Sequence, residues 1–161
     1  MAKINSKTVI GHVHLKVSDI NRSLRFYCDV LGLEIVTWYG DQAVFLSAGE
    51  YHHHIGLNTW HSKNGVPPPS KSTGLYHFAI LLPSRLELAK TVKRIQDANY
   101  PIDDAQDHGV SEAVYLKDPD GNGIELYYDR PKEEWPRDKN GIIQFPTKNL
   151  SIDSILNELS D

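Results

Sequence analysis

Residues 8–17, TVIGHVHLKV, alternate β-branched and polar side chains, a pattern that predicts a strand with His12 near its middle. Residues 74–82, GLYHFAILL, form a second strand-like run, in which His77 takes the matching place. Farther along, the tetrapeptide AVFL at 43–46 is answered by AVYL at 113–116. Self-similarity of this kind indicates that the chain contains two copies of one supersecondary unit.

The first copy, module one, covers residues 8–60. Asp19 offers an N-cap oxygen and Gly32 a C-terminal stop, so a helix is predicted between them. Three strand-like runs follow, at 33–39, 42–46 and 53–60. Module one is therefore predicted to have the order βαβββ.

The second copy, module two, covers residues 74–130 and follows a proline-bearing linker at 61–73. Ser84 opens its helix, and strands are predicted at 102–104, 113–116 and 123–128. Residues 131–161 form a C-terminal extension that ends in a short helix. We therefore predict an α+β fold in which two tandem βαβββ modules form a curved mixed sheet around a cleft, within a single domain spanning 1–161.

Composition limits the partners of this chain. Its 161 residues are 40% hydrophobic, and 17 Lys and Arg against 21 Asp and Glu give a net charge of −4, which argues against nucleic acid. The single cysteine, Cys28, allows no internal disulfide, and neither a signal peptide nor a membrane-length apolar run is apparent. We expect a cytoplasmic protein without membrane or nucleic-acid partners.

Three metal-binding side chains fall at matching places of the repeat. His12 and His77 lie in the first strands of the two modules, and Glu125 lies in the last strand of module two. The equivalent position in module one is Gly56, which leaves the fourth corner of the predicted cleft empty. Two histidines and one carboxylate with open positions are typical of non-haem Fe(II); Mn(II) also fits, and Zn(II) sites use three protein ligands too.

Alternative readings exist for several of these residues. His12 alone fits a buried histidine that backbone groups satisfy, and His14 shares a face with His12 by strand alternation, so His14 is an alternative ligand. Glu125 could instead pair with a surface base such as Arg130. We interpret three other histidines as structural: His52, His53 and His61.

Three motifs resemble one known family. They are GHVHLKV at 11–17, FYCDVLGL at 26–33 and DPDGNGIEL at 118–126. Over residues 8–130 the chain is similar to the vicinal oxygen chelate superfamily, which includes glyoxalases, bleomycin resistance proteins and extradiol dioxygenases. Within it the chain most resembles the catechol 2,3-dioxygenase type. The resemblance implies His12, His77 and Glu125 as the metal ligands.

The resemblance also implies three catalytic residues. His54 matches the family's acid/base histidine, and period-two alternation places it on the face of Gly56. His108 begins an HGVS run, and Tyr115 lies ten residues before the carboxylate. These matches imply an Fe(II)-dependent extradiol dioxygenase that acts on a small aromatic diol and dioxygen. His54 would take and return a proton, while Tyr115 and His108 would hold bound oxygens by hydrogen bonds.

Two other functions remain open within the same superfamily. One is a metal-dependent lyase or isomerase of the glyoxalase kind, or a thiol transferase, with Zn(II) or Ni(II) as the metal. Glyoxalase-type sites fill the fourth corner with a carboxylate or amide, and Gly56 argues against that reading. The other is a metal-free drug-binding resistance protein. Exposed strand edges of the modules favour a homodimer.

Overall fold

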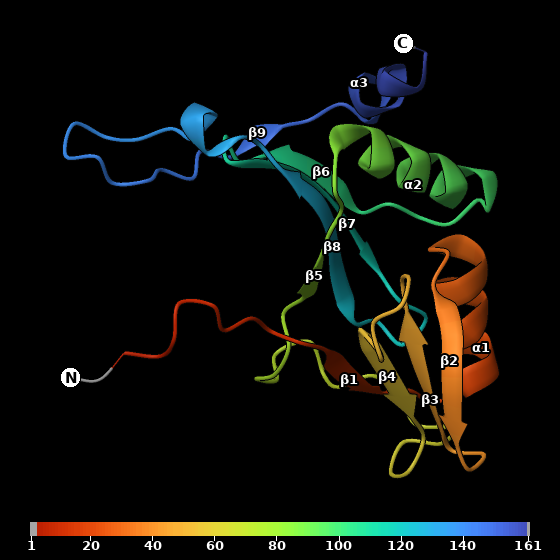
Figure 1. Cartoon of the computed structure of the whole chain (residues 1–161). Coiled ribbons are helices and arrows are strands. Elements are labelled where there is room, and N and C mark those ends of the chain that lie inside the picture. The colour runs from red at the N-terminus through yellow and green to blue at the C-terminus, as the bar shows by residue number, and fades with distance from the viewer. Residues whose placement is uncertain (1–2, 161) are drawn as a thin grey trace. The chain divides into compact units, whose positions relative to one another are not determined.

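The structure, a computed structural model, describes residues 3–160 of the chain (Figure 1). These residues form two compact units that divide between Val66 and Pro67, inside the predicted linker. Each unit carries its own mixed sheet, with four strands in unit 1 and five in unit 2. The predicted α+β fold with two βαβββ copies is confirmed.

Unit 1 contains the first copy of the repeat. Its elements are β1 (Val13–Lys16), α1 (Ile20–Leu24), the π-helical turn η1 (Arg25–Val30), β2 (Glu34–Tyr39), β3 (Ala43–Ser47) and β4 (Ile55–Asn58). The strand order is β1-β4-β3-β2, and β1 runs parallel to β4. Asp19 caps α1 as predicted, by accepting a hydrogen bond from the amide of Arg22.

Unit 2 repeats this arrangement and extends it. Its elements are β5 (Phe78–Leu81), α2 (Arg85–Asp97), β6 (Asp104–Asp107), β7 (Ser111–Lys117), β8 (Gly123–Asp129), η2 (Lys132–Glu134), β9 (Lys148–Asn149), α3 (Ile152–Leu156) and η3 (Asn157–Leu159). The order is β5-β8-β7-β6-β9, with β5 parallel to β8. Ser84 caps α2, whose buried face includes Leu88, Val92 and Ile95.

The two sheets also repeat in register. Gly56 pairs with Phe45 across β4 and β3, and Glu125 pairs with Tyr115 across β8 and β7. The two predicted histidine ligands each lie one residue before the first strand of their unit. The sequence match between the modules is therefore a match of three-dimensional position inside each unit.

Several predicted strand limits were wrong. β1 begins at Val13, because its partner β4 has only four residues; Val9 and Ile10 are 81% and 91% exposed. The strand predicted at 102–104 lies at Asp104–Asp107 instead, and β9 was not predicted. β9 pairs with β6 through two residues only, too short a segment for any alternation to show.

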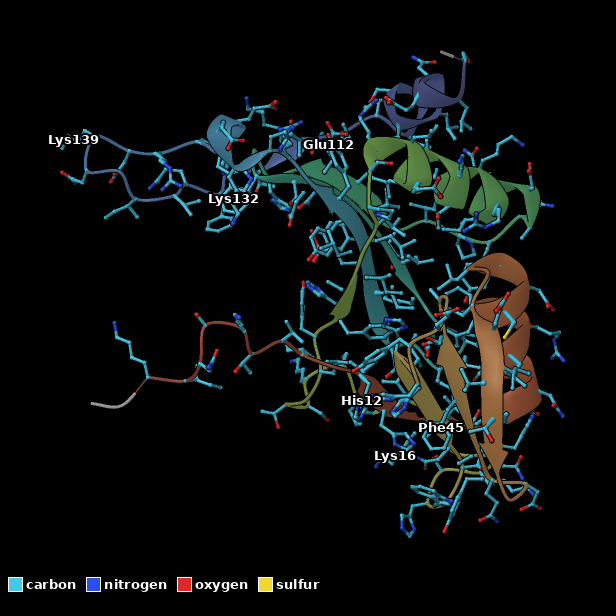
Figure 2. The ribbon with its side chains drawn as sticks, viewed as in Figure 1. His12, Lys16, Phe45, Glu112, Lys132 and Lys139 are labelled. Carbon is cyan, nitrogen blue, oxygen red and sulfur yellow. The ribbon has the colours of Figure 1, made fainter. Side chains whose placement is uncertain are left out.

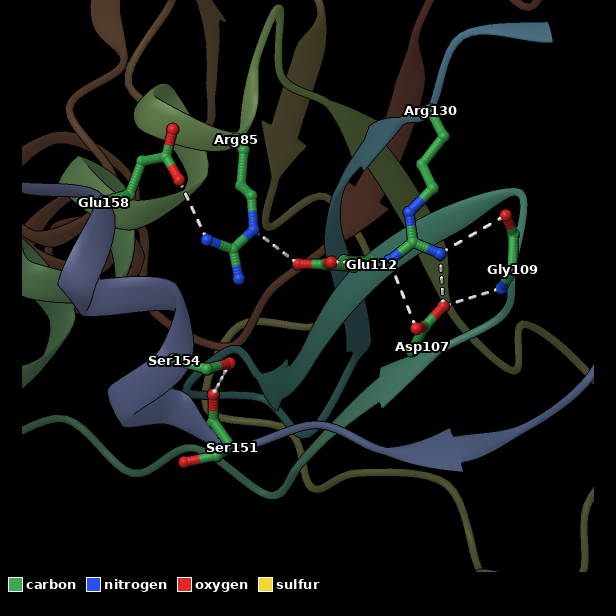
Figure 3. A network of polar contacts seen from close by, with 8 residues as sticks. All are labelled: Arg85, Asp107, Gly109, Glu112, Arg130, Ser151, Ser154 and Glu158. Carbon is green, nitrogen blue, oxygen red and sulfur yellow. Dashed lines mark hydrogen bonds and ion pairs between the residues drawn. The ribbon is translucent and has the colours of Figure 1, made fainter. Parts of the chain in front are cut away.

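Arg85 links the C-terminal extension to the repeat, and Arg130 shares its partner Glu112 within the repeat (Figure 3). Arg130 donates to Asp107 at 2.8 Å and to Glu112 at 2.6 Å. Arg85, at the start of α2, donates to Glu112 and to Glu158, each at 2.9 Å. Glu112 is only 6% exposed, so its charge is shared between two cations where water reaches it poorly.

No helix within residues 3–160 is long and apolar enough to cross a bilayer.

Candidate metal centre

Four predicted site residues of unit 2 form one connected polar cluster. Nε2 of His77 lies 3.1 Å from Oε2 of Glu125. The hydroxyl of Tyr115 donates to Oε1 of the same carboxylate at 3.1 Å, and Nε2 of His108 lies 2.8 Å from that hydroxyl. Unit 2 therefore brings together His77, Glu125, Tyr115 and His108.

Strand alternation produces this cluster. Glu125 lies between Ile124 and Leu126, which are each 1% exposed, so its side chain leaves β8 on the opposite face. Tyr115 lies directly across from Glu125 on β7 and projects on that same face. Cross-strand partners are close enough for their side chains to interact, which explains the hydrogen bond.

The direction of the hydrogen bonds follows from the donor inventory. Tyr115 has one hydroxyl proton, which it donates to Glu125. Nε2 of His108 must then be the donor to the Tyr115 oxygen. Burial, followed by the negative charge of Glu125, raises the pKa of Tyr115 well above its usual value. Tyr115 is therefore a neutral donor at physiological pH.

Glu125 is not paired with Arg130, the alternative that the sequence left open. Arg130 is occupied by Asp107 and Glu112, while the partners of Glu125 are His77 and Tyr115. The carboxylate side chain is 15% exposed and the His77 side chain 32%, so both remain reachable from solvent. This supports a role for Glu125 in binding rather than in surface charge pairing.

The His77 and Glu125 donors fit a divalent metal. Two ligands about 2.1 Å from one ion at a right angle lie about 3 Å apart, which agrees with the 3.1 Å between Nε2 of His77 and Oε2 of Glu125. Within either unit, residues 3–160 do not gather three His, Cys, Asp or Glu side chains into one metal-binding group. Unit 2 thus presents a two-donor arrangement of the right chemistry.

In unit 1, His12 lies against a histidine that we had interpreted as structural. The rings of His12 and His53 are 4.3 Å apart between centroids, and His53 also lies 4.9 Å from Phe45. Nδ1 of His53 is 2.8 Å from Nδ1 of His52. No residue spacing signals this contact; it follows from the backbone, in which the amide of Val13 donates a hydrogen bond to the carbonyl of His54, the residue after His53.

His54 is held by the turn that follows β3. Its Nδ1 lies 2.9 Å from Oγ of Ser47 and accepts a 3.3 Å hydrogen bond from the amide of Ala48. Because the amide can only donate, Nδ1 is an acceptor, and the neutral ring carries its proton on Nε2. His54 therefore presents an N–H group, and His53 is the histidine of this segment in ring contact with His12.

The space beside Gly56 in unit 1 is occupied by the ring of His14. A Cβ placed on Gly56 would lie 2.9 Å from two ring atoms of His14, so the imidazole of His14 fills the space that a side chain would take. Its ring also contacts Phe45 and Trp60. Burial, and then the nearby His12, lower the pKa of His14, which favours a neutral ring packed in place.

Comparison with known proteins identifies the family. Residues 9–126 match the Glyoxalase/Bleomycin resistance protein/Dioxygenase superfamily. The chain belongs to this superfamily. The matched range begins before β1 and ends inside β8, one residue after Glu125, so the resemblance found in the three motifs is confirmed.

Curated members of the superfamily show which branches are similar. The chain is 41% identical to a catechol-2,3-dioxygenase of Bacillus subtilis over its full length, which is 55% of that protein. It is 31% identical to biphenyl-2,3-diol 1,2-dioxygenase 3 of Rhodococcus globerulus, over 74% of the chain and 63% of the relative. The chain thus spans a little over half the length of these two dioxygenases.

A third relative and a solved structure are similar to the chain over nearly their whole lengths. The metallothiol transferase FosB of Staphylococcus epidermidis is 25% identical over 86% of the chain and 95% of that protein. The crystal structure of a glyoxylase/bleomycin resistance protein/dioxygenase domain from Frankia sp. EAN1pec has a TM-score of 0.63 at 22% identity, over 78% of the chain and all of the domain. This likeness supports the fold.

Proposed function

We propose that the protein is an Fe(II)-dependent extradiol dioxygenase that opens a catechol-like ring with dioxygen. His12, His77 and Glu125 are the proposed protein ligands. Fe(II) would supply the Lewis acid and redox centre that lets a catecholate react with dioxygen. Similarity to a catechol-2,3-dioxygenase at 41% identity supports this branch of the superfamily.

The observation that carries the proposal is the chain of contacts from His108 through Tyr115 to Glu125 and His77. A bare lyase or drug-binding site has no need of a neutral tyrosine donor beside the ligand carboxylate. In the proposed reaction, oxygens of the substrate and product take over the hydrogen bonds that Tyr115 and His108 donate, in this structure, to Glu125 and to Tyr115. Both groups are donors in the geometry described above, which suits oxygen atoms that gain negative charge.

Proton transfer has two candidates in unit 1. His54 is the residue that the family resemblance implies, and its Nε2–H suits the step in which a proton is given. His53 is the second candidate, because its ring contacts the proposed ligand His12. We therefore propose that one of these two imidazoles exchanges a proton with the substrate hydroxyl.

The decisive experiment is reconstitution without oxygen followed by exposure to air. Protein loaded separately with Fe(II), Mn(II), Zn(II) or Ni(II) is mixed with catechol, and oxygen uptake and the yellow ring-opened product are recorded. We expect turnover with Fe(II), and with Mn(II) as the second choice. If neither Fe(II) nor Mn(II) gives product at full metal occupancy, the proposed dioxygenase activity is refuted. His61→Ala is the matched control, since His61 is exposed and outside the site.

A metal-dependent thiol transferase is the second candidate function. The chain is similar to a metallothiol transferase of Staphylococcus epidermidis, with 25% identity over 86% of the chain. The same metal-loaded samples, given a thiol and an epoxide antibiotic, separate the two functions. Adduct formation without ring cleavage would favour the transferase.

The remaining expectations are part of this proposal. A small aromatic diol and dioxygen are the proposed reactants, and a cytoplasmic homodimer is the proposed state of the protein. Sedimentation of the metal-loaded protein measures its oligomeric state directly.

A further inference from the structure

The loop between β6 and β7 contains His108. β6 ends at Asp107 and β7 begins at Ser111, so the loop consists of residues 108–110 alone. His108 is the first of these, and its Nε2 donates to the hydroxyl oxygen of Tyr115 at 2.8 Å. Tyr115 itself is fixed, because β7 is paired with β6 on one side and with β8 on the other. The contact between His108 and Tyr115 therefore depends on how the loop is held.

Arg130, the residue after β8, holds the loop from one side. Its guanidinium donates to both carboxylate oxygens of Asp107, at 2.8 and 3.1 Å (Figure 3). Asp107 in turn accepts the amide of Gly109 at 2.7 Å. The amide of Arg130 donates to the carbonyl of Val110 at 2.8 Å. A two-pronged bond between arginine and carboxylate fixes direction as well as distance, so the residues on both sides of His108 are held through Arg130.

The C-terminal extension holds the loop from the other side. Gly109 has a φ of +73°, and a Cβ placed on it would lie 2.7 Å from Cγ of Pro136 and 2.9 Å from Cγ of Pro146. The indole of Trp135 donates to the carbonyl of Arg130 at 2.8 Å, which ties the start of the extension to the same arginine. The family match ends at residue 126, so Arg130 and the extension both lie outside it.

A buried carboxylate orients the Arg130 guanidinium. Glu112, which is 6% exposed, accepts a 2.6 Å hydrogen bond from it. Figure 2 shows Glu112 at the end of the unit 2 sheet where the extension, labelled at Lys132, begins. Glu112 also accepts a 2.9 Å bond from Arg85, whose second partner is Glu158. Both carboxylates that Arg85 binds lie outside the loop, so the two arginines share one partner but differ in their contact with the loop.

We propose that Arg130 is a positioning residue for His108. Through Asp107 and Val110 it holds the loop in the form in which the Nε2–H group of His108 points at the Tyr115 oxygen. A donor that is already aimed needs no rearrangement when a substrate oxygen takes over its bond. The effect on turnover rests on the proposed function, because only there does His108 act on a substrate oxygen. The contact between His108 and Tyr115 can be measured without it.

The first test observes the His108 side chain by NMR in the full-length protein without metal. Its Nε2–H group, held by Tyr115, should give a directly coupled ¹H–¹⁵N signal, which is assigned by its absence from His108→Ala. Tyr115→Phe removes the acceptor and should broaden this signal through exchange with water. We expect the same loss in Arg130→Gln, because the loop is no longer held.

Arg85→Gln is the matched control. It removes the other arginine from the buried carboxylate of Glu112 and leaves the contacts of the loop in place. The His108 signal should therefore remain. Equal loss of the signal in Arg85→Gln and Arg130→Gln would mean that Arg130 only supports the fold, and would overturn the inference.

Arg130→Lys separates geometry from charge. Lysine keeps a cation beside Glu112, so this variant should fold, which thermal unfolding checks. Its single ammonium group cannot make the paired bonds to Asp107. We expect the His108 signal to be lost here too. A folded Arg130→Lys variant with an unchanged His108 signal would refute the proposal.

The second test measures turnover of catechol by the Fe(II)-loaded variants. We expect kcat to fall about 10- to 100-fold in Arg130→Gln with metal content unchanged, and to stay at the wild-type value in Arg85→Gln. A lost His108 signal with an unchanged kcat would overturn the positioning role in turnover. If the wild-type protein turns over no catechol, the proposed reaction fails, and loss of the signal in the Arg130 variants alone would still support the positioning of His108.

Discussion

Tyr115 donates a 3.1 Å hydrogen bond to Oε1 of Glu125, its direct partner across β7 and β8, while His77 approaches the other carboxylate oxygen. The carboxylate is thus held from two sides before any ligand arrives. Groups that orient a metal ligand are commonly as important for activity as the ligand itself.

Tyr115→Phe tests this orientation. Phe45 occupies the equivalent position in unit 1, so phenylalanine fits the strand and the fold should be unchanged. We expect Fe(II) to be retained and kcat to fall about 10- to 100-fold. Tyr100→Phe, which removes a tyrosine hydrogen bond to the Lys117 carbonyl elsewhere in unit 2, is the control and should keep full activity.

Removal of a proposed ligand should act on metal binding first. His77→Ala and Glu125→Gln should each weaken Fe(II) affinity by more than about 100-fold, because even outer partners cost about 10- to 100-fold. Metal content after desalting measures this directly, with His61→Ala as control. Full occupancy in either variant would show that the proposed ligand set is wrong.

Parallel variants distinguish the two histidines of unit 1. If His54 transfers the proton, His54→Phe should lower turnover and leave the metal content unchanged. If His53 transfers it, the same result is expected for His53→Phe. His54→Phe also removes the bonds to Ser47 and Ala48, so its thermal unfolding must be measured beside its kinetics. Activity retained in both variants would assign proton transfer to another group.

Gly56→Ala should destabilise unit 1. The new methyl group would lie 2.9 Å from the His14 ring, and overpacking of this kind costs about 1–3 kcal/mol. His14→Ala in the same chain should remove most of that cost, which a double-mutant cycle measured by urea unfolding would show. Additive costs would mean that the ring and the glycine do not share the space.

Acid stability should depend on Asp107. Burial alone would raise the pKa of Asp107, but the hydrogen bond from Arg130 and then that from the Gly109 amide outweigh it and lower the pKa. Because the pKa is depressed in the folded state, this stabilisation is present above the usual aspartate value of about 3.9 and disappears as the pH falls through the folded value. Asp107→Asn should therefore flatten the acid side of a plot of Tm against pH.

The repeat could be predicted from two independent signals. Both modules have the same order of strand and helix periodicities, and residues at equivalent positions match between them. The cluster around Glu125 was also predictable, since period two and the family motifs both place Tyr115 and His77 near the carboxylate. The contacts of His53 and His14 were not. They depend on how two rings turn out of a strand end, which packing against Phe45 and Gly56 decides rather than residue spacing.

Strand limits were missed for a related reason. Residues 8–12 have the composition of a strand, but no described strand continues opposite them, and a lone extended segment gains little from its own propensity. β9 is the opposite case, a strand that was not predicted. Two residues of the extension pair with β6, and nothing in the sequence around them indicates that pairing.

The short β9 leaves the two repeats unequally protected. It covers the outer edge of β6 in unit 2, whereas β2 at the edge of unit 1 is paired, among the described residues, with β3 alone. Positions 35–39 of β2 read IVTWY, without a charge or a proline. Such a bare, uncharged edge is a template for intermolecular β-pairing, so aggregation during heating or concentration should begin in the first repeat.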